Sequence, residues 1–220
     1  MKLSTCIHQF FGNYLPRIKG VSNHTIKAYR DTFKLFLPFA AKYQNIKIKS
    51  LQLDHLLPDL VLTFLDEIEQ KRNNTARTRN HRLAAIKSLA KMIRFMYPEK
   101  RELAEKILNI PQKRMQKKLI GFLHPEETFK VLESINLKKK DGFRDYTILH
   151  LLYDSGARAS EIATLNLDYF NPFKKSLGIL GKGNRYRLIS LWPKTAELIK
   201  LYIAKYRKSA KDVISTAAVY

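Results

Sequence analysis

Two short motifs in the second half of the chain contain residue types that bind phosphate. The first is Asp154-Ser155-Gly156-Ala157-Arg158-Ala159-Ser160-Glu161, in which Gly156 allows a sharp exit from a preceding helix. Residues three apart share a helix face, so Glu161 can hold Arg158. A guanidinium held in this way is suited to gripping two phosphate oxygens. The alternative is a surface ion pair of little energetic value, and this motif taken alone favours that alternative.

The second motif is Gly181-Lys182-Gly183-Asn184, which the sequence places in a β-turn between two strands. The glycines let the backbone turn tightly and approach a ligand. A lysine at the tip can reach a phosphate or a leaving oxygen, although an ordinary solvated turn would have the same composition. The spacing of a nucleotide-binding P-loop is missing, so that class of phosphate site is excluded.

The charge of the chain favours a polyanionic partner. Lys and Arg number 41 against 19 Asp and Glu, which gives a net charge of +22. Nucleic acid is the first expectation, with an anionic membrane surface or an acidic protein as alternatives. Residues 71–118 contain fifteen basic and three acidic residues. The near absence of acids on the helix expected at about 76–97 favours a DNA-facing helix over a solvated one.

Cysteine usage and hydropathy exclude several other classes. The single cysteine, Cys6, gives no disulfide framework and no metal cluster. We expect no metal and, separately, no cofactor. The first residues lack the apolar core of a signal peptide. No stretch approaches the ~18 apolar residues of a membrane span, so no membrane partner is predicted. A cytoplasmic location is the simplest fit.

Hydrophobic periodicity predicts helices in the first half and a mixed pattern in the second. Helices are expected at Thr25–Tyr43, with Asn23 as N-cap and Pro38 kinking or ending it, from Pro58, and from after Thr75 to about Tyr97. A basic, aperiodic linker is expected at 109–120. Beyond it we expect a helix start at His124–Glu127, a helix at Arg144–Asp154, a short helix through Leu165, a strand-turn-strand over 177–191 and a helix from Pro193.

Taken together, the two motifs resemble the tyrosine recombinase, or phage-integrase, family. The run from Arg144 to Leu165 is similar to the segment that holds the first catalytic arginine of that family. The resemblance therefore implies that Arg158 is this arginine, that Glu161 helps to arrange the site, and that Lys182 is the catalytic lysine. Further segments resemble the helical core-binding domain or the start of the catalytic domain: Asn23–Tyr29 and Thr78–Lys87 for the former, and Leu123–Glu127 for the latter.

The implied fold is mainly α. A helical core-binding (SAM-like) domain is expected at 1–108 and a basic linker at 109–120. An incomplete α+β catalytic domain with a small antiparallel sheet is expected at 121–220. Double-stranded DNA is the expected partner, with other recombinase protomers on the same DNA. The predicted DNA-binding residues are Thr78, Arg79, Arg82, Lys87, Lys91, Lys113, Arg114, Asn184 and Arg185.

The sequence departs from the family pattern downstream of Lys182. Family members transfer a DNA strand to a tyrosine, with a second arginine in a His-x-x-Arg motif. None of the six histidines here has an arginine three residues later, and the terminal Tyr220 has no visible support. We therefore expect DNA binding with an incomplete set of catalytic groups. Three alternatives stay open: a regulator or competitor at recombination sites, an enzyme completed by another chain, and a generic RNA-binding helical protein.

Overall fold

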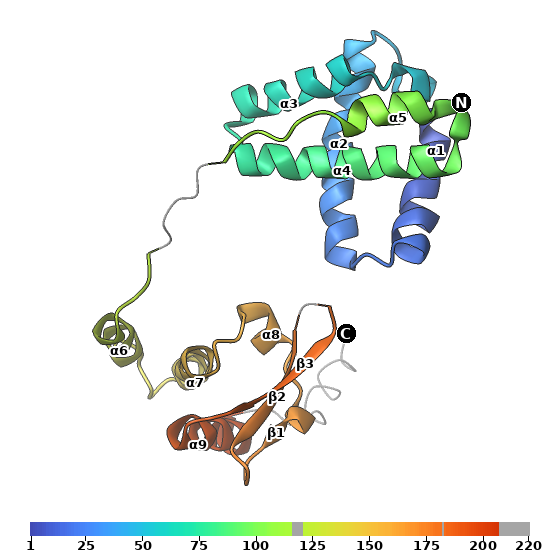
Figure 1. The fold of residues 1–220 in the computed structure, drawn as a ribbon. Helices are drawn as coiled ribbons and strands as arrows, with labels where there is room; N and C mark the ends of the chain where they lie inside the picture. The colour runs from blue at the N-terminus through green and yellow to red at the C-terminus, as the bar shows by residue number, and fades with distance from the viewer. Residues whose placement is uncertain (116–120, 182, 207–220) are drawn as a thin grey trace, which may run out of the picture. The chain divides into compact units, whose positions relative to one another are not determined.

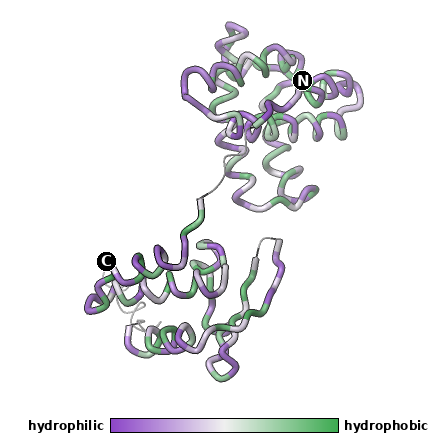
Figure 2. The backbone as a smooth tube through the Cα atoms, turned by 60° about the vertical axis from the view of Figure 1, so that its left-hand side comes forward, coloured by the Kyte–Doolittle hydropathy of each residue, from purple (hydrophilic) through white to green (hydrophobic). Residues whose placement is uncertain are grey.

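The structure is a computed structural model that describes residues 1–115, 121–181 and 183–206. The chain divides into two compact units, Met1–Lys118 and Leu119–Tyr220 (Figure 1). Hydrophobic and hydrophilic stretches alternate along the helices of both units, as expected for helices that bury one face (Figure 2).

The first unit is built from helices over its described residues. Its elements are α1 (Leu3–Gln9), the π-helical η1 (Phe10–Ile18), α2 (Asn23–Tyr43), η2 (Ile48–Ser50), η3 (Leu53–His55), α3 (Pro58–Arg72), α4 (Ala76–Met96), η4 (Pro98–Lys100) and α5 (Arg101–Leu108). Aromatic side chains join the helices at the centre. The ring of Phe36 on α2 lies 6.1 Å from that of Phe33 and 5.1 Å from that of Phe64 on α3. The predicted mainly helical fold class is confirmed.

Two details of α2 differ from the sequence-based prediction. The N-cap is Ser22 rather than Asn23, because the Ser22 hydroxyl accepts a hydrogen bond from the Thr25 amide at 3.4 Å. Pro38 does not end the helix, which continues to Tyr43. The missing amide of Pro38 removes one backbone hydrogen bond. Continued burial of Phe36 and Ala40 on either side favours an unbroken helix.

The first residues of the predicted linker pack against the first unit. Ile110 is buried with the core of that unit. The Asn80 side chain on α4 donates to the Lys113 carbonyl at 2.8 Å and accepts from the Lys113 amide at 3.0 Å. The backbone is therefore fixed as far as Lys113. The predicted domain boundaries themselves stay a prediction.

The second unit combines helices with a small sheet. Its elements are α6 (Pro125–Glu133), α7 (Lys140–Ser155), α8 (Ala159–Ala163), η5 (Leu167–Tyr169), β1 (Phe170–Asn171), β2 (Ser176–Gly181), β3 (Arg185–Ser190), α9 (Pro193–Leu201) and η6 (Tyr202–Tyr206). The strands form an antiparallel sheet in the order β1-β2-β3. The pair formed by β2 and β3 was predicted, whereas β1 was not. The helix expected from Arg144 begins earlier, at Lys140, where Asp141 lies in the first turn near the positive end of the helix dipole.

The core of the second unit is small over its described residues. The buried hydrophobic residues of its core cluster are Leu151, Leu177, Ile179, Leu191, Ala196 and Ile199. An apolar groove of about 390 Å³ lies beside them, lined by residues of α7, α8, β2, α9 and η6. No described helix of either unit is both long enough and apolar enough to cross a membrane.

Candidate phosphate site and nucleic-acid interface

The residues before Arg158 build the turn that presents it. Gly156 ends α7 in the left-handed conformation, with φ of 58°, and its amide donates to the Leu152 carbonyl at 3.0 Å. The Ser155 hydroxyl donates to the Leu151 carbonyl at 2.5 Å and accepts from the Ala157 amide at 3.2 Å. Arg158 follows as the N-cap residue of α8. The polar residues of the first motif therefore have a structural use, which is to reverse the chain ahead of the arginine.

Glu161 holds Arg158 through both its backbone and its side chain. One carboxylate oxygen accepts from the Arg158 amide at 3.0 Å, and the other accepts from Arg158 Nη1 at 2.8 Å. The Glu161 side chain is only 5% exposed, whereas that of Arg158 is 68% exposed. The pair is thus more than a surface ion pair, because a buried carboxylate fixes one end of a guanidinium that faces solvent.

Arg187 on β3 is a third member of this cluster, and it was not predicted from the sequence. Its Nη2 donates to Glu161 Oε2 at 2.7 Å, and its Nη1 lies 3.4 Å from Oε1. These hydrogen bonds from Arg187, followed by the one from the Arg158 amide, lower the pKa of Glu161 to about 2. Strand alternation is the signal that could have found Arg187, because it shares the half-buried face of β3 with Ile189.

The glycine that opens the second motif lies against the same cluster. A Cβ atom on Gly181 would lie 3.1 Å from Arg187 Nη1 and 3.2 Å from Glu161 Oε1. Lys182 itself lies outside the described residues. Asn184 is exposed with φ of 60°, and Arg185 is exposed at the start of β3. The structure therefore brings the arginine motif and the base of the hairpin together at Glu161.

The predicted DNA-binding residues of α4 differ widely in exposure. Arg79 is buried, with Nε 3.2 Å from Glu69 and Nη2 4.0 Å from Asp66. Arg82 is half-buried, and burial lowers its pKa, with the charge of Arg72 adding to the effect. These two side chains contribute to the helix packing as well as to the charge.

Lys87 and Lys91 lie further along α4. Lys87 is half-buried, and its pKa is lowered first by burial and then by neighbouring Lys91. Lys91 is exposed. Of the remaining predicted contacts, Thr78 is half-buried next to its capping residue Thr75, Lys113 pairs with Glu69 at 3.1 Å, and Arg114 is exposed.

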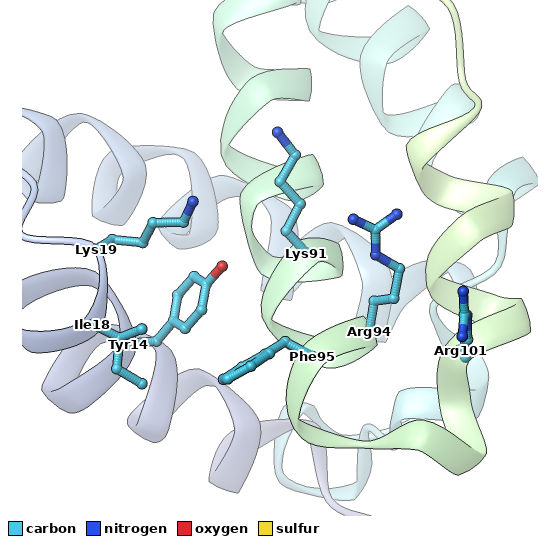
Figure 3. A pocket seen from close by; sticks show the side chains of 7 residues that line it. All are labelled: Tyr14, Ile18, Lys19, Lys91, Arg94, Phe95 and Arg101. Carbon is cyan, nitrogen blue, oxygen red and sulfur yellow. The ribbon is translucent and has the colours of Figure 1, made fainter.

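A cationic pocket lies where α4 meets η1 and α5. It has a volume of about 750 Å³ and is lined by Tyr14, Ile18, Lys19, Lys91, Arg94, Phe95 and Arg101. Lys19 and the Tyr14 hydroxyl stand on one side and Lys91 and Arg94 on the other (Figure 3). None of the lining residues is acidic. Lys19 and Arg101 were not predicted from the sequence, because only the fold brings them beside α4.

Both sites present N–H donors of the kind that suit anionic oxygen. Arg158 uses one nitrogen on Glu161 and keeps further N–H donors for a ligand. No group of three or more histidine, cysteine or acidic side chains within the described residues is arranged to hold a metal ion.

Comparisons with known proteins agree with this arrangement. The family profile described as "Phage integrase, N-terminal SAM-like domain" matches residues 7–94, and "Phage integrase family" matches residues 121–216. The integrase/recombinase y4rD of Sinorhizobium fredii is 33% identical over 206 residues, which cover 93% of this chain and 73% of y4rD. The tyrosine recombinase XerD of Staphylococcus epidermidis is 28% identical over 219 residues, which cover 99% of this chain and 70% of XerD.

Solved structures show the same fold. The XerH site-specific recombinase bound to palindromic difH substrate superposes with a TM-score of 0.62 at 23% identity, covering 81% of this chain. The Tn1549 transposon integrase in complex with a circular intermediate DNA gives a TM-score of 0.65 at 13% identity, covering 93% of this chain. The chain spans 52% of the XerH chain and 66% of the Tn1549 integrase chain.

Proposed function

Because the chain belongs to the phage-integrase family of tyrosine recombinases, we propose that it binds double-stranded DNA and holds one backbone phosphate at Arg158. The observation that carries this proposal is the exposed guanidinium of Arg158, fixed at one end by buried Glu161. Arg158 can donate two parallel hydrogen bonds to the oxygens of a phosphate. The relatives XerH and Tn1549 integrase are themselves seen bound to DNA.

The wider interface that we propose follows α4 and ends at the cationic pocket. Lys91 and Arg94 are exposed on this helix, and Lys19 and Arg101 join them from neighbouring elements. Each lysine or arginine that neutralises a DNA phosphate releases counterions, so affinity falls with salt at about −0.9 log units per log unit of salt for each contact. Thr78, Arg82, Lys87, Arg114, Asn184 and Arg185 are proposed as further contacts to the DNA.

For the 220-residue polypeptide on its own, we propose DNA binding without strand cleavage. In strand transfer, negative charge builds up on the non-bridging oxygens of the phosphate, and several donors must meet it. Arg158 and Lys182 supply two cations, while no histidine in the sequence has an arginine three residues later. A phosphate held by Arg158 and Lys182 alone would lack the second arginine and the tyrosine nucleophile that family members use.

Two assays test the two parts of the proposal, and the second uses a nicked suicide substrate. DNA binding is measured by fluorescence anisotropy with duplex DNA and duplex RNA, and cleavage by a protein–DNA adduct on a denaturing gel. We expect DNA to bind more tightly than RNA and no adduct to form. Equal affinity for both duplexes would favour the generic RNA-binding alternative. An adduct that is lost with Tyr220→Phe would make that tyrosine the nucleophile and overturn the proposal.

Association with other protomers on DNA is part of the same proposal, and it follows from the family resemblance. The stoichiometry on a duplex, measured by analytical ultracentrifugation, distinguishes a single bound chain from an assembly. A non-catalytic regulator would bind recombination sites equally well, and it would lower strand exchange when it is added to a full-length recombinase that uses the same site.

A further inference from the structure

Arg187 joins two segments that the sequence keeps far apart. It lies on β3 opposite Ile179 of β2, and its guanidinium reaches Glu161 on α8. Both carboxylate oxygens of Glu161 are engaged, Oε2 at 2.7 Å and Oε1 at 3.4 Å. Arg187 therefore ties the hairpin that carries the lysine motif to the helix that begins at Arg158.

We propose that Arg187 is a positioning residue that keeps Arg158 available to a phosphate by occupying the Glu161 carboxylate. The inference rests on the proposed function, because it takes Arg158 to be the phosphate ligand. Arg187 itself is less available to a phosphate than Arg158 is. Its side chain is 38% exposed against 68% for Arg158, and two of its nitrogens face Glu161.

The charge of the cluster supports these separate roles, phosphate binding by Arg158 and positioning by Arg187. Two guanidinium groups around one carboxylate carry a net positive charge, whereas one guanidinium and one carboxylate are neutral as a pair. Without Arg187, the buried Glu161 would have Arg158 as its one remaining charged partner among the residues that the structure describes. A buried carboxylate needs paired hydrogen-bond donors. Arg158 would then be drawn into a two-bond pair with Glu161, and it would lose much of its attraction for phosphate.

The space around Gly181 supports the same reading. The Arg187 guanidinium passes within 3.1 Å of the position that a Cβ atom on Gly181 would take, and Glu161 within 3.2 Å. A side chain at this position would push on both members of the pair. The hairpin therefore leaves room for Arg187 to cross from β3 to α8.

The experiment is a double-mutant cycle in the full 220-residue chain. The variants are Arg187→Gln, Arg158→Ala and their combination, with affinity for a labelled DNA duplex measured over a range of salt. Arg187→Gln should weaken binding about tenfold, as expected for the loss of a hydrogen bond to a charged group. It should also reduce the salt slope by about 0.9. In the Arg158→Ala background the same substitution should have no further effect.

Two readouts separate positioning from a general structural role. The carboxyl carbon of Glu161, followed by NMR, should titrate at about pH 2 in the parent chain and at a higher pH in Arg187→Gln. Arg187→Lys keeps the charge without the two-pronged geometry, so it should recover part of the lost affinity. Lys174→Gln, an exposed change in the turn before β2, is the control for loss of one charge.

Each outcome decides between specific readings. If Arg187→Gln weakens binding equally in both backgrounds, Arg187 contacts DNA directly and the proposal is wrong. If Arg158→Ala weakens binding and Arg187→Gln does not, the positioning role fails while the phosphate role of Arg158 stands. If Arg158→Ala has no effect, the proposed function fails at this residue, and the positioning role fails with it.

Discussion

Glu161 and Gly181 lie so close that a Cβ atom on the glycine would stand 3.2 Å from the Glu161 carboxylate. This approach connects the arginine motif on α8 to the end of β2, next to the lysine motif. It also makes the glycine a sensitive point for testing the cluster without removing any charge.

Gly181→Ala should keep the fold and disturb the cluster. Gly181 does not have a positive φ, so alanine fits the backbone, but its methyl group would displace Arg187 or Glu161 by a few tenths of an ångström. We expect the pKa of Glu161 to rise from about 2 and DNA affinity to fall severalfold. NMR titration and anisotropy check this. An unchanged Glu161 pKa would show that the pair absorbs the methyl group.

Glu161→Gln should make the stability of the folded chain depend less on pH below about 4.5. The pKa of Glu161 is about 2 in the folded chain against a usual 4.5, chiefly through Arg187. Its contribution is therefore present above pH 4.5 and lost as the pH falls toward 2. Thermal melts can be followed at Trp192, the single tryptophan, which lies in the second unit. Glu197→Gln, which breaks an exposed pair with Lys200, is the control and should change little.

Arg79→Ala and Lys91→Ala should separate stability from DNA binding. Arg79 is buried against Glu69, so its loss should lower the free energy of unfolding by about 1–3 kcal/mol. Lys91 is exposed, so its loss should change stability by less than about 0.5 kcal/mol. It should instead weaken DNA binding and reduce the salt slope by about 0.9. Chemical denaturation and anisotropy measure the two effects, and the reverse pattern would remove this face of α4 from the interface.

Asn80→Ala should release the segment that follows α5. It removes both hydrogen bonds to the Lys113 backbone. We expect faster trypsin cleavage after Lys113 and Arg114, while cleavage after Arg72 at the end of α3 serves as the internal reference. Equal rates in the parent and variant chains would mean that the two hydrogen bonds do not hold this segment in solution.

His150 should make the second unit sensitive to mild acid. It is buried, and burial together with Lys194 lowers its pKa from the usual 6.5, while Asp154 opposes this effect. Because the unfolded chain takes up this proton first, the free energy of unfolding is highest above about pH 6.5. It decreases as the pH falls from 6.5 toward the lower pKa that His150 has in the folded chain. His150→Leu should remove this component from melts followed at Trp192. His24→Leu, at an exposed site, should leave it in place.

The sequence predicted the elements better than it predicted the surroundings of individual side chains. Pro58 and Gly156 mark element ends locally, and both lie where expected. The burial of Arg79 was not predicted, because its partner Glu69 comes from another helix. Arg187 was missed for the same reason, since Glu161 meets it only after β3 has paired with β2. Contacts between elements depend on packing, and one sequence without its fold does not specify them.

The hydrogen bonds between Asn80 and Lys113 also limit how many residues can separate the two units. The backbone is held on α4 as far as Lys113, and α6 begins at Pro125, so a tether between the units can include at most residues 114–124. Each tether residue adds at most about 3.5 Å. Once one unit is bound to DNA, a short tether raises the effective concentration of the other unit near the same duplex. If both units bind one duplex, the side-chain amide of Asn80 therefore contributes to avidity through the backbone that it holds.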